Sequence, residues 1–263
     1  MKLWAKAGPQ GNGGLNVKNA MEGLTMVSKE MESRIDKFIA DNRQNIVNDI
    51  AALVNIKSVS QACDNPQAPY GEGCRKVLDK ALQMCEQMGF ATKNYDYYAG
   101  SAAYGSGEKE IALLGHLDVV PEGDGWSHDP YDMIEKDGYI YGRGVADDKG
   151  PTVLGLYAMK CMKDFGIQPN YTFRLVMGCS EETGMSDMPH YLAAEKAPAF
   201  AFTPDADFPV CIGEKGQLSV AIELAVDGKT ITGFTGGTVG NAVCASAIPF
   251  SWSAATASSS SCR

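Results

Sequence analysis

The stretch that decides the fold is residues 115–150, GHLDVVPEGDGWSHDPYDMIEKDGYIYGRGVADDKG. Near its start, His116 and Asp118 stand two positions apart. On an extended backbone both side chains leave the same face, so one can bind a metal ion while the other orients it. Asp147 adds a carboxylate near the end of the stretch. These residue types predict half of a site for two metal ions.

Hydrophobic periodicity on both sides of this stretch predicts helices that alternate with strands. The predicted helices are 33–54, 77–88, 150–166 and 187–194, and the predicted strands are 92–98, 111–114, 138–141, 171–177, 200–203 and 217–226. This alternation is typical of an α/β fold with a mostly parallel sheet flanked by helices. In such folds ligand sites lie beyond the carboxyl ends of the strands.

Composition narrows the range of possible functions. The chain has 263 residues and a net charge of -9, without a cluster of Lys and Arg, which argues against a nucleic-acid partner. No apolar run approaches the roughly 18 to 20 residues of a membrane helix, and the N-terminus has no secretory pattern. Eight cysteines occur without a CxxC pair, as expected for reduced thiols. We therefore expect a cytoplasmic protein that binds neither membranes nor nucleic acids.

Seven groups able to bind metal or move protons follow predicted strands: His116, Asp118, Asp147, Asp148, Glu181, Glu182 and Asp205. One such acid alone is usually a helix cap or a solvated loop residue. Carboxylates gathered at one sheet edge repel one another unless a cation lies between them. The set therefore predicts a metal centre with mixed nitrogen and oxygen ligands, which suit zinc.

Position suggests roles for some of these groups. Asp147 is suited to bridge two metal ions, and Asp118 to hold His116. Glu181 and Glu182 are adjacent and point apart, so one can bind metal while the other faces the attacking water.

Three other residues invite a functional reading but have simpler explanations. His128 lies in the turn-rich segment GWSHDP and is interpreted as a surface residue. His190 lies on the predicted helix 187–194 and is interpreted as solvated or packed. Cys179 is interpreted as a small buried residue, because no histidine is positioned by sequence to activate its thiol.

Four ordered motifs resemble one family of enzymes. They are GHLDVVP (115–121), GRGVADDKGP (142–151), SEETG (180–184) and PDADFP (204–209). The chain resembles the cocatalytic zinc peptidases and amidohydrolases, which include aminoacylase, acetylornithine deacetylase, succinyl-diaminopimelate desuccinylase and carnosinase. DDKGP together with GDGWSHDPYD is most similar to the branch of carnosinase and the bacterial dipeptidase PepV.

The resemblance implies a ligand set for two zinc ions. His116 and Asp205 would bind one zinc, Glu182 the other, and Asp147 both. The peptide bond after the bridging aspartate, between Asp147 and Asp148, would be cis. Mn²⁺ or Co²⁺ could replace zinc, because mixed nitrogen and oxygen ligands discriminate weakly among these ions.

The resemblance also implies a reaction. Glu181 would be the general base and Asp118 the acid that orients the histidine, in a zinc-dependent dipeptidase that hydrolyses small peptides with a metal-bridged water. An N-acyl amino acid deacylase or desuccinylase with the same chemistry is one alternative. An inactive, truncated metal-binding fragment is another. The sequence leaves the side-chain preference and the oligomeric state open.

The chain departs from the family pattern in its last third. The family has a late zinc-binding histidine, but no histidine follows His190. We therefore expect one well-ligated zinc site and one poor site. Segment 236–245, GGTVGNAVCA, resembles the first strand of the family's α+β lid domain, which makes Asn241 a candidate substrate contact.

These observations predict four segments. Residues 1–25 are expected to be a disordered or non-native extension, and 26–226 the N-terminal part of the catalytic domain. Residues 227–247 are expected to begin the lid. Residues 248–263 are serine-rich and resemble nothing in the family, as in a truncated or frameshifted chain.

Overall fold

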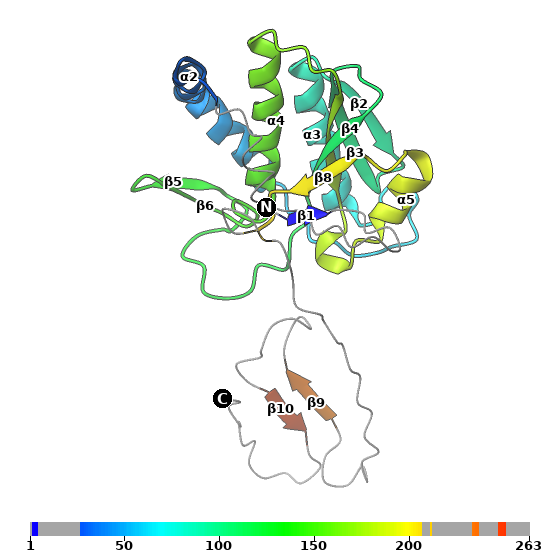
Figure 1. The fold of residues 1–263 in the computed structure, drawn as a ribbon. Coiled ribbons are helices and arrows are strands. Elements are labelled where there is room, and N and C mark those ends of the chain that lie inside the picture. Colours follow the sequence, from blue (N-terminus) through cyan, green and yellow to red (C-terminus); the bar gives the residue numbers. More distant parts are fainter. Residues whose placement is uncertain (1, 5–26, 207–210, 212–232, 237–246, 251–263) are drawn as a thin grey trace. The chain divides into compact units, whose positions relative to one another are not determined.

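The computed structural model describes residues 2–4, 27–206, 211, 233–236 and 247–250 (Figure 1). The chain divides into two compact units, Met1–Glu214 and Lys215–Arg263. The first unit contains the motifs identified above. In the second unit, the described residues form one antiparallel pair, β9 (Gly233–Gly236) and β10 (Ala247–Phe250).

A six-stranded sheet runs through the first unit in the order β1-β8-β4-β7-β3-β2. Its strands are β1 (Lys2–Trp4), β2 (Ala91–Tyr95), β3 (Ala99–Tyr104), β4 (Glu110–His116), β7 (Thr172–Gly178) and β8 (Phe200–Thr203). The helices are α2 (Lys29–Val54), α3 (Glu72–Gln87), α4 (Lys149–Asp164) and α5 (Asp187–Ala194), with a short 3₁₀ turn η1 (Glu181–Thr183). A separate hairpin consists of β5 (Ile134–Lys136) and β6 (Tyr139–Tyr141). The predicted α/β class is confirmed.

The parallel part of the sheet is its centre. β4 pairs in parallel with β7 on one side and with β8 on the other, whereas β1, β3 and β2 add antiparallel flanks, so the sheet is mixed. His116 at the end of β4 is in register with Gly178 at the end of β7. The three parallel strands therefore end at the same edge, where the predicted metal-binding groups follow.

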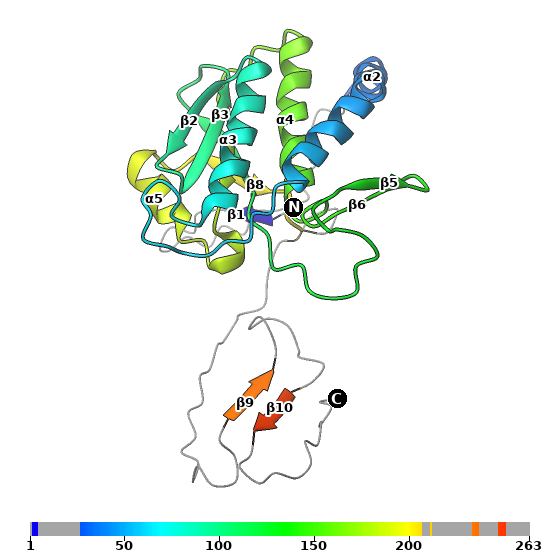
Figure 2. The same cartoon turned by 180° about the vertical axis from the view of Figure 1, so that it is seen from behind.

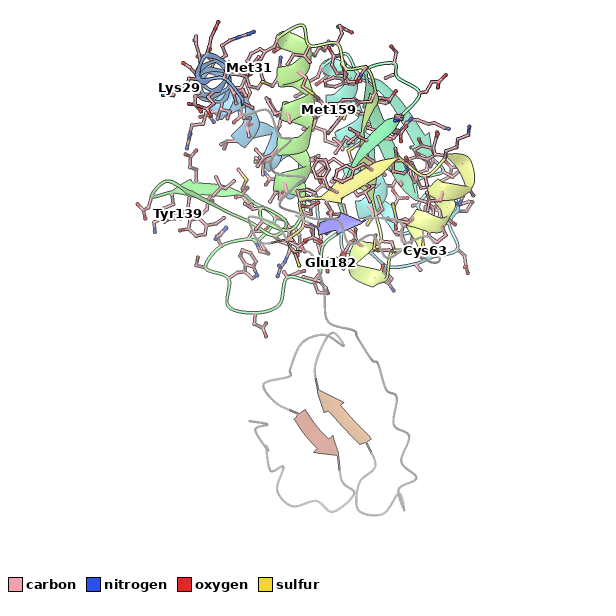
Figure 3. The ribbon with its side chains drawn as sticks, in the orientation of Figure 1. Lys29, Met31, Cys63, Tyr139, Met159 and Glu182 are labelled. Carbon is pink, nitrogen blue, oxygen red and sulfur yellow. The ribbon has the colours of Figure 1, made fainter. Side chains whose placement is uncertain are left out.

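Three helices cover one face of the sheet. α3 and α4 pack on the strands and α2 packs against both helices (Figures 1 and 2). Side chains alternate across a strand, so Leu113 of β4 and Leu175 and Met177 of β7 face this helical layer. Met159 of α4 is completely buried in the same layer, whereas Tyr139 of the hairpin projects outward (Figure 3).

The opposite face of the sheet carries the short helix α5. Ala112 and Val176, the alternate residues of β4 and β7, pack there with Tyr191 of α5. The ring of Tyr191 meets Tyr95 edge-on at 4.9 Å between centroids. This contact fixes α5 against the end of β2.

Several sequence predictions for helices and strands are confirmed, and a few are wrong. Helix 187–194 and strand 200–203 are found with the predicted bounds. Ile39 belongs to the apolar stripe by which helix 33–54 is predicted and should face the core, but it is 51% exposed on α2. The predicted strand 138–141 lies in the β5–β6 hairpin and not in the main sheet. Strand β3 was not predicted.

The N-terminal and C-terminal predictions fall largely outside the described residues. Lys2–Trp4 forms β1, a strand that the sequence pattern does not indicate. Residues 5–26, the predicted strand 217–226 and the boundary at 226–227 are not described, so these expectations stay predictions. Ala247–Phe250 forms β10, which extends regular structure past the expected boundary at 247.

Among the described residues, none of the helices has both the length and the apolar character needed to cross a lipid bilayer.

Two leucines on the helices, one buried and one exposed, allow a test of the proposed core. Leu78 of α3 is fully buried, whereas Leu154 of α4 is 53% exposed. Leu78→Ala should lower the free energy of unfolding by about 2 to 5 kcal/mol, because it leaves a cavity in the core. Leu154→Ala should change it by less than about 0.5 kcal/mol. Urea unfolding followed by circular dichroism measures both, and equal effects would contradict this packing.

Candidate metal centre

The three parallel strands and α4 bring the candidate residues to one place. His116 ends β4, Glu181 and Glu182 lie in η1 after β7, and Asp205 follows β8. Asp147 differs from the prediction that each candidate follows a strand of the sheet. It lies in the turn that enters α4, and the strand before it belongs to the separate hairpin. α4 packs on β4, which brings this turn to the edge where β4 ends.

The imidazole of His116 is held in one orientation. Its Nδ1 lies 2.9 Å from the backbone carbonyl oxygen of Asp118 and 3.3 Å from the Oδ1 of that residue. A carbonyl oxygen only accepts hydrogen bonds, so Nδ1 is the donor. In the neutral ring Nε2 is then unprotonated and can bind a metal ion.

Two carboxylates face this nitrogen. Nε2 of His116 lies 2.9 Å from Oδ1 of Asp147 and 4.0 Å from Oδ2 of Asp205. One ligand atom from each residue can be chosen so that all three lie within 4.8 Å of one another. One imidazole and two carboxylates form a donor set that fits a divalent ion such as zinc and leaves a coordination position for water or substrate.

The charges in the centre also favour a cation. Burial acts to lower the pKa of His116, but hydrogen bonds to the carboxylates of Asp118 and Asp147 outweigh it and raise this pKa to about 11. Burial, together with the nearby charge of Asp147, raises the pKa of Glu182 to about 7. One imidazole is surrounded by several carboxylates, and a bound divalent ion would reduce their mutual repulsion.

Asp118 connects the histidine to the η1 turn. Its side chain is fully buried. Besides contacting His116, its Oδ1 accepts a hydrogen bond from the amide of Glu181 at 3.2 Å, and its Oδ2 accepts one from the amide of Glu182 at 3.1 Å. One carboxylate therefore orients groups from β4 and from η1.

The turn that carries Asp147 is held in place by the next residue, Asp148. The peptide bond between Asp147 and Asp148 is cis, as the family resemblance implied. Oδ2 of Asp148 accepts hydrogen bonds from the amide of His116 and the hydroxyl of Thr152, both at 3.2 Å. Burial raises the pKa of Asp148 to about 7. Asp148 therefore holds the backbone of His116 in place. It does not belong to the three-residue cluster of His116, Asp147 and Asp205.

Lys149 is a buried cation whose role the sequence did not indicate. Its Nζ donates hydrogen bonds to the carbonyl oxygens of Leu53, at 3.0 Å, and Ile56, at 2.8 Å. Burial lowers the pKa of this amine to about 7. The first residue of α4 is thereby tied to the end of α2.

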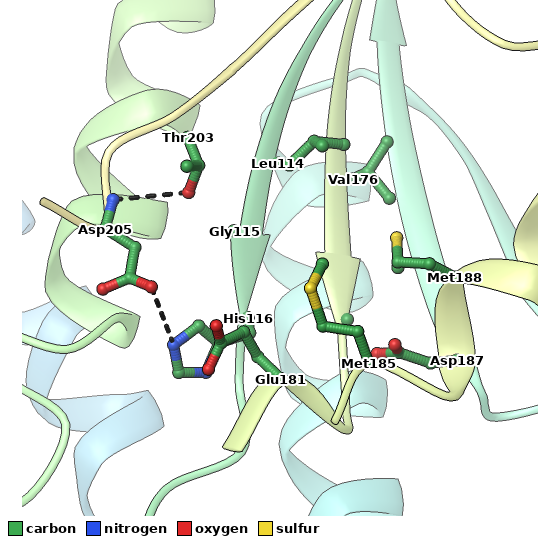
Figure 4. A pocket seen from close by; sticks show the side chains of 11 residues that line it. Leu114, Gly115, His116, Val176, Glu181, Met185, Asp187, Met188, Thr203 and Asp205 are labelled. Atoms are coloured by element: carbon green, nitrogen blue, oxygen red, sulfur yellow. Dashed lines mark hydrogen bonds and ion pairs between the residues drawn. The ribbon is translucent and has the colours of Figure 1, made fainter. Parts of the chain in front are cut away.

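Glu181 faces a pocket of about 120 Å³ next to the cluster (Figure 4). Its polar end contains His116, Glu181 and Asp205. The remaining wall is largely apolar and includes Leu114, Val176, Met185 and Met188. The carboxylate of Glu181 thus lies in the same pocket as two of the three clustered residues.

The predicted roles of Glu182 and Asn241 stay predictions. Glu182 is half-buried in η1, and its role as a metal ligand stays a prediction. Asn241 lies outside the described residues. The other histidines have ordinary surroundings: His190 stacks on Tyr98 with centroids 4.0 Å apart, and His128 packs edge-on against Trp126.

Comparison with known proteins gives one family. Residues 112–255 match the model of peptidase family M20/M25/M40. This range contains every proposed site residue and continues beyond residue 247, where the resemblance was expected to end.

Two bacterial relatives have similar sequences. The chain is 38% identical over 181 residues to YtjP of Bacillus subtilis (strain 168). This match covers 68% of the chain and 39% of YtjP. It is 37% identical over 200 residues to the Beta-Ala-Xaa dipeptidase of Lactobacillus delbrueckii subsp. lactis, covering 75% of the chain and 42% of that enzyme. The chain thus spans about two fifths of the length of these relatives.

Solved structures support the fold. Human carnosine dipeptidase 1 matches with a TM-score of 0.54 and 23% identity, over 62% of the chain and 38% of that structure. The di-peptidase Dug1p from Saccharomyces cerevisiae matches with a TM-score of 0.51 and 21% identity, over 62% of the chain and 37% of that structure.

Proposed function

The chain belongs to peptidase family M20/M25/M40, and from this premise we propose that it acts as a zinc-dependent dipeptidase. The observation that carries the proposal is the convergence of ligand atoms from His116, Asp147 and Asp205 within 4.8 Å, beside the pocket that Glu181 lines. The name of the Lactobacillus relative, a Beta-Ala-Xaa dipeptidase, supports dipeptides as the substrate class.

In this proposal, separate side chains bind the metal ions and orient the histidine ligand. His116 and Asp205 would hold one zinc ion, Asp147 would bridge, and Glu182 would contribute to a second ion. Zinc bound there supplies Lewis-acid chemistry: it lowers the pKa of water toward about 7 and polarises an amide carbonyl. Asp118 keeps Nδ1 of His116 protonated, so that Nε2 stays available as a ligand.

Glu181 would act as general base and then as general acid. Its carboxylate takes a proton from the attacking water and later delivers that proton to the nitrogen of the leaving amine. The amide bond breaks, a carboxylate and an amine form, and Glu181 returns to its starting charge. The hydrogen bond from its own amide to Asp118 fixes the backbone from which it acts.

Zinc binding and hydrolysis can be tested separately. The purified chain is loaded with zinc, its bound metal is counted by mass spectrometry, and it is then assayed with β-alanyl and α-aminoacyl dipeptides beside N-acetyl and N-succinyl amino acids. We expect bound zinc and preferential hydrolysis of the dipeptides. Manganese and cobalt loading in parallel would compare the alternative metals.

Each contrary result has a defined meaning. Preference for acyl amino acids would replace the dipeptidase by a deacylase of the same chemistry. Bound zinc without turnover of either class would make this chain a metal-binding fragment. Absence of bound transition metal after zinc loading would remove the proposed centre altogether.

A further inference from the structure

Four successive backbone amides before and within η1 donate to buried aspartates. The amides of Cys179 and Ser180 donate to Oδ2 of Asp187, at 2.7 and 3.0 Å. The next two amides, those of Glu181 and Glu182, donate to Asp118. All four N–H groups of residues 179–182, which include the proposed base, are therefore held by one of two carboxylates.

Asp187 is as buried as a core residue. It is 1% exposed, at the start of α5, and that helix is fixed to the sheet through Tyr191. Its Oδ1 has no hydrogen-bond partner among the described residues. A carboxylate is costly to bury, and its charge-assisted hydrogen bonds to the two amides offset part of that cost.

The end of β7 is shaped to admit this carboxylate. A Cβ atom added to Gly178 would lie 2.5 Å from Oδ2 of Asp187, closer than real Cβ contacts. The φ of Gly178 is not positive, so glycine is needed here for space and not for an unusual backbone conformation. The absence of a side chain at 178 and the acid at 187 thus act together.

We propose that Asp187 is a positioning residue for the reaction: by holding the amides of Cys179 and Ser180, it sets the direction in which Glu181 and Glu182 leave β7. Asp118 holds the second half of the same segment from the histidine side. Glu181 would reach its water, and Glu182 its metal ion, only while both carboxylates are in place. The assignment rests on the proposed function, because it gives Glu181 and Glu182 their tasks.

Three variants separate positioning from bulk stability. Asp187→Ala removes the acceptor. Asp187→Asn keeps an oxygen toward the amides and removes the charge. Gly178→Ala keeps the carboxylate but displaces it. Asp36→Ala, at an exposed position of α2, is the matched control.

The first readout needs neither metal nor turnover. In the metal-free full chain, amide hydrogen exchange at Cys179 and Ser180 should rise at least about tenfold in Asp187→Ala and Gly178→Ala. Exchange in β4 and α3 should stay within about twofold of the original chain. Unchanged exchange at the two amides would overturn the proposal whatever the enzyme does.

The second readout tests the link to chemistry. In the zinc-loaded chain, kcat for a dipeptide should fall about 10- to 100-fold in Asp187→Ala with KM within about threefold, and Asp187→Asn should retain more activity. If the original chain shows no turnover, the dipeptidase proposal fails, and zinc affinity by chelator competition takes its place, with about tenfold weakening expected in Asp187→Ala. Asp187 would have only a structural role if exchange became faster while kcat stayed unchanged. In a chain without turnover, faster exchange with unchanged zinc affinity would have the same meaning. Either result would overturn the positioning proposal.

Discussion

Replacing Glu181 with glutamine is expected to lower kcat for dipeptide hydrolysis by about 100- to 10,000-fold. The amide side chain has nearly the same size but cannot take a proton from water at neutral pH. The backbone amide of residue 181 would still donate to Asp118, so the segment should keep its position. Bound zinc and KM should therefore stay close to those of the original chain.

The matched control is Glu108→Gln, which removes the same charge from an exposed loop. Steady-state kinetics and metal analysis are made on both variants from the same preparation scheme. Retained turnover in Glu181→Gln would rule out Glu181 as the base. A parallel loss of zinc and turnover would instead make Glu181 a metal ligand, with Glu182 as the candidate base.

Replacing His116 with alanine is expected to weaken zinc binding by at least on the order of 100-fold. Loss of a residue that only supports a ligand typically weakens metal binding by about 10- to 100-fold, and loss of a ligand itself should cost at least as much. His116 is the one nitrogen ligand in the three-residue cluster, and two facing carboxylates would remain without it. Competition with a chromophoric chelator measures the affinity, and mass spectrometry gives the stoichiometry.

His190→Ala is the control for this loss of an imidazole, because His190 stacks on Tyr98 and pairs with Asp96 away from the cluster. His116 is only 3% exposed, so its replacement also leaves a cavity. Asp205→Asn is therefore measured as a second ligand variant that keeps the histidine. Normal zinc affinity in both His116→Ala and Asp205→Asn would contradict the proposed ligand set.

The sequence predicted which side chains gather at this sheet edge because strand ends are readable from local pattern. The apolar run 111–114 leads directly to His116, and the predicted strand 171–177 differs by one residue from β7 at each end. Parallel strands in register end together, so groups distant in the chain could be predicted to meet. The family resemblance then supplied roles that geometry alone would have left open.

Strand β3 was missed for a local reason. Its sequence AGSAAY is rich in small residues that favour strands only weakly. The turn before it places Asp96 and Tyr97 at φ 51° and 61° without a glycine, so the usual hairpin signal is absent. Pairing with β2 and β7 forms this strand where propensity does not.

Asp187 and Lys149 were missed because burial is a property of the whole fold. An aspartate at a helix start is ordinary, since the helix dipole favours it there. A lysine after two aspartates is equally ordinary as a solvated charge. Only the packing of α5 on the sheet and of α4 on α2 shows that both side chains are enclosed.

The bond from Lys149 to the end of α2 bears on how the chain is made. The amine and the carbonyl of Leu53 are separated by 96 positions in the sequence. During synthesis α2 emerges before α4, so the part of its apolar stripe that packs on α4 stays uncovered until the ribosome has added those positions. Contacts so distant in sequence slow folding, and apolar surface exposed in the meantime is prone to aggregation. The packing of α2 is therefore completed only after α4 has been made.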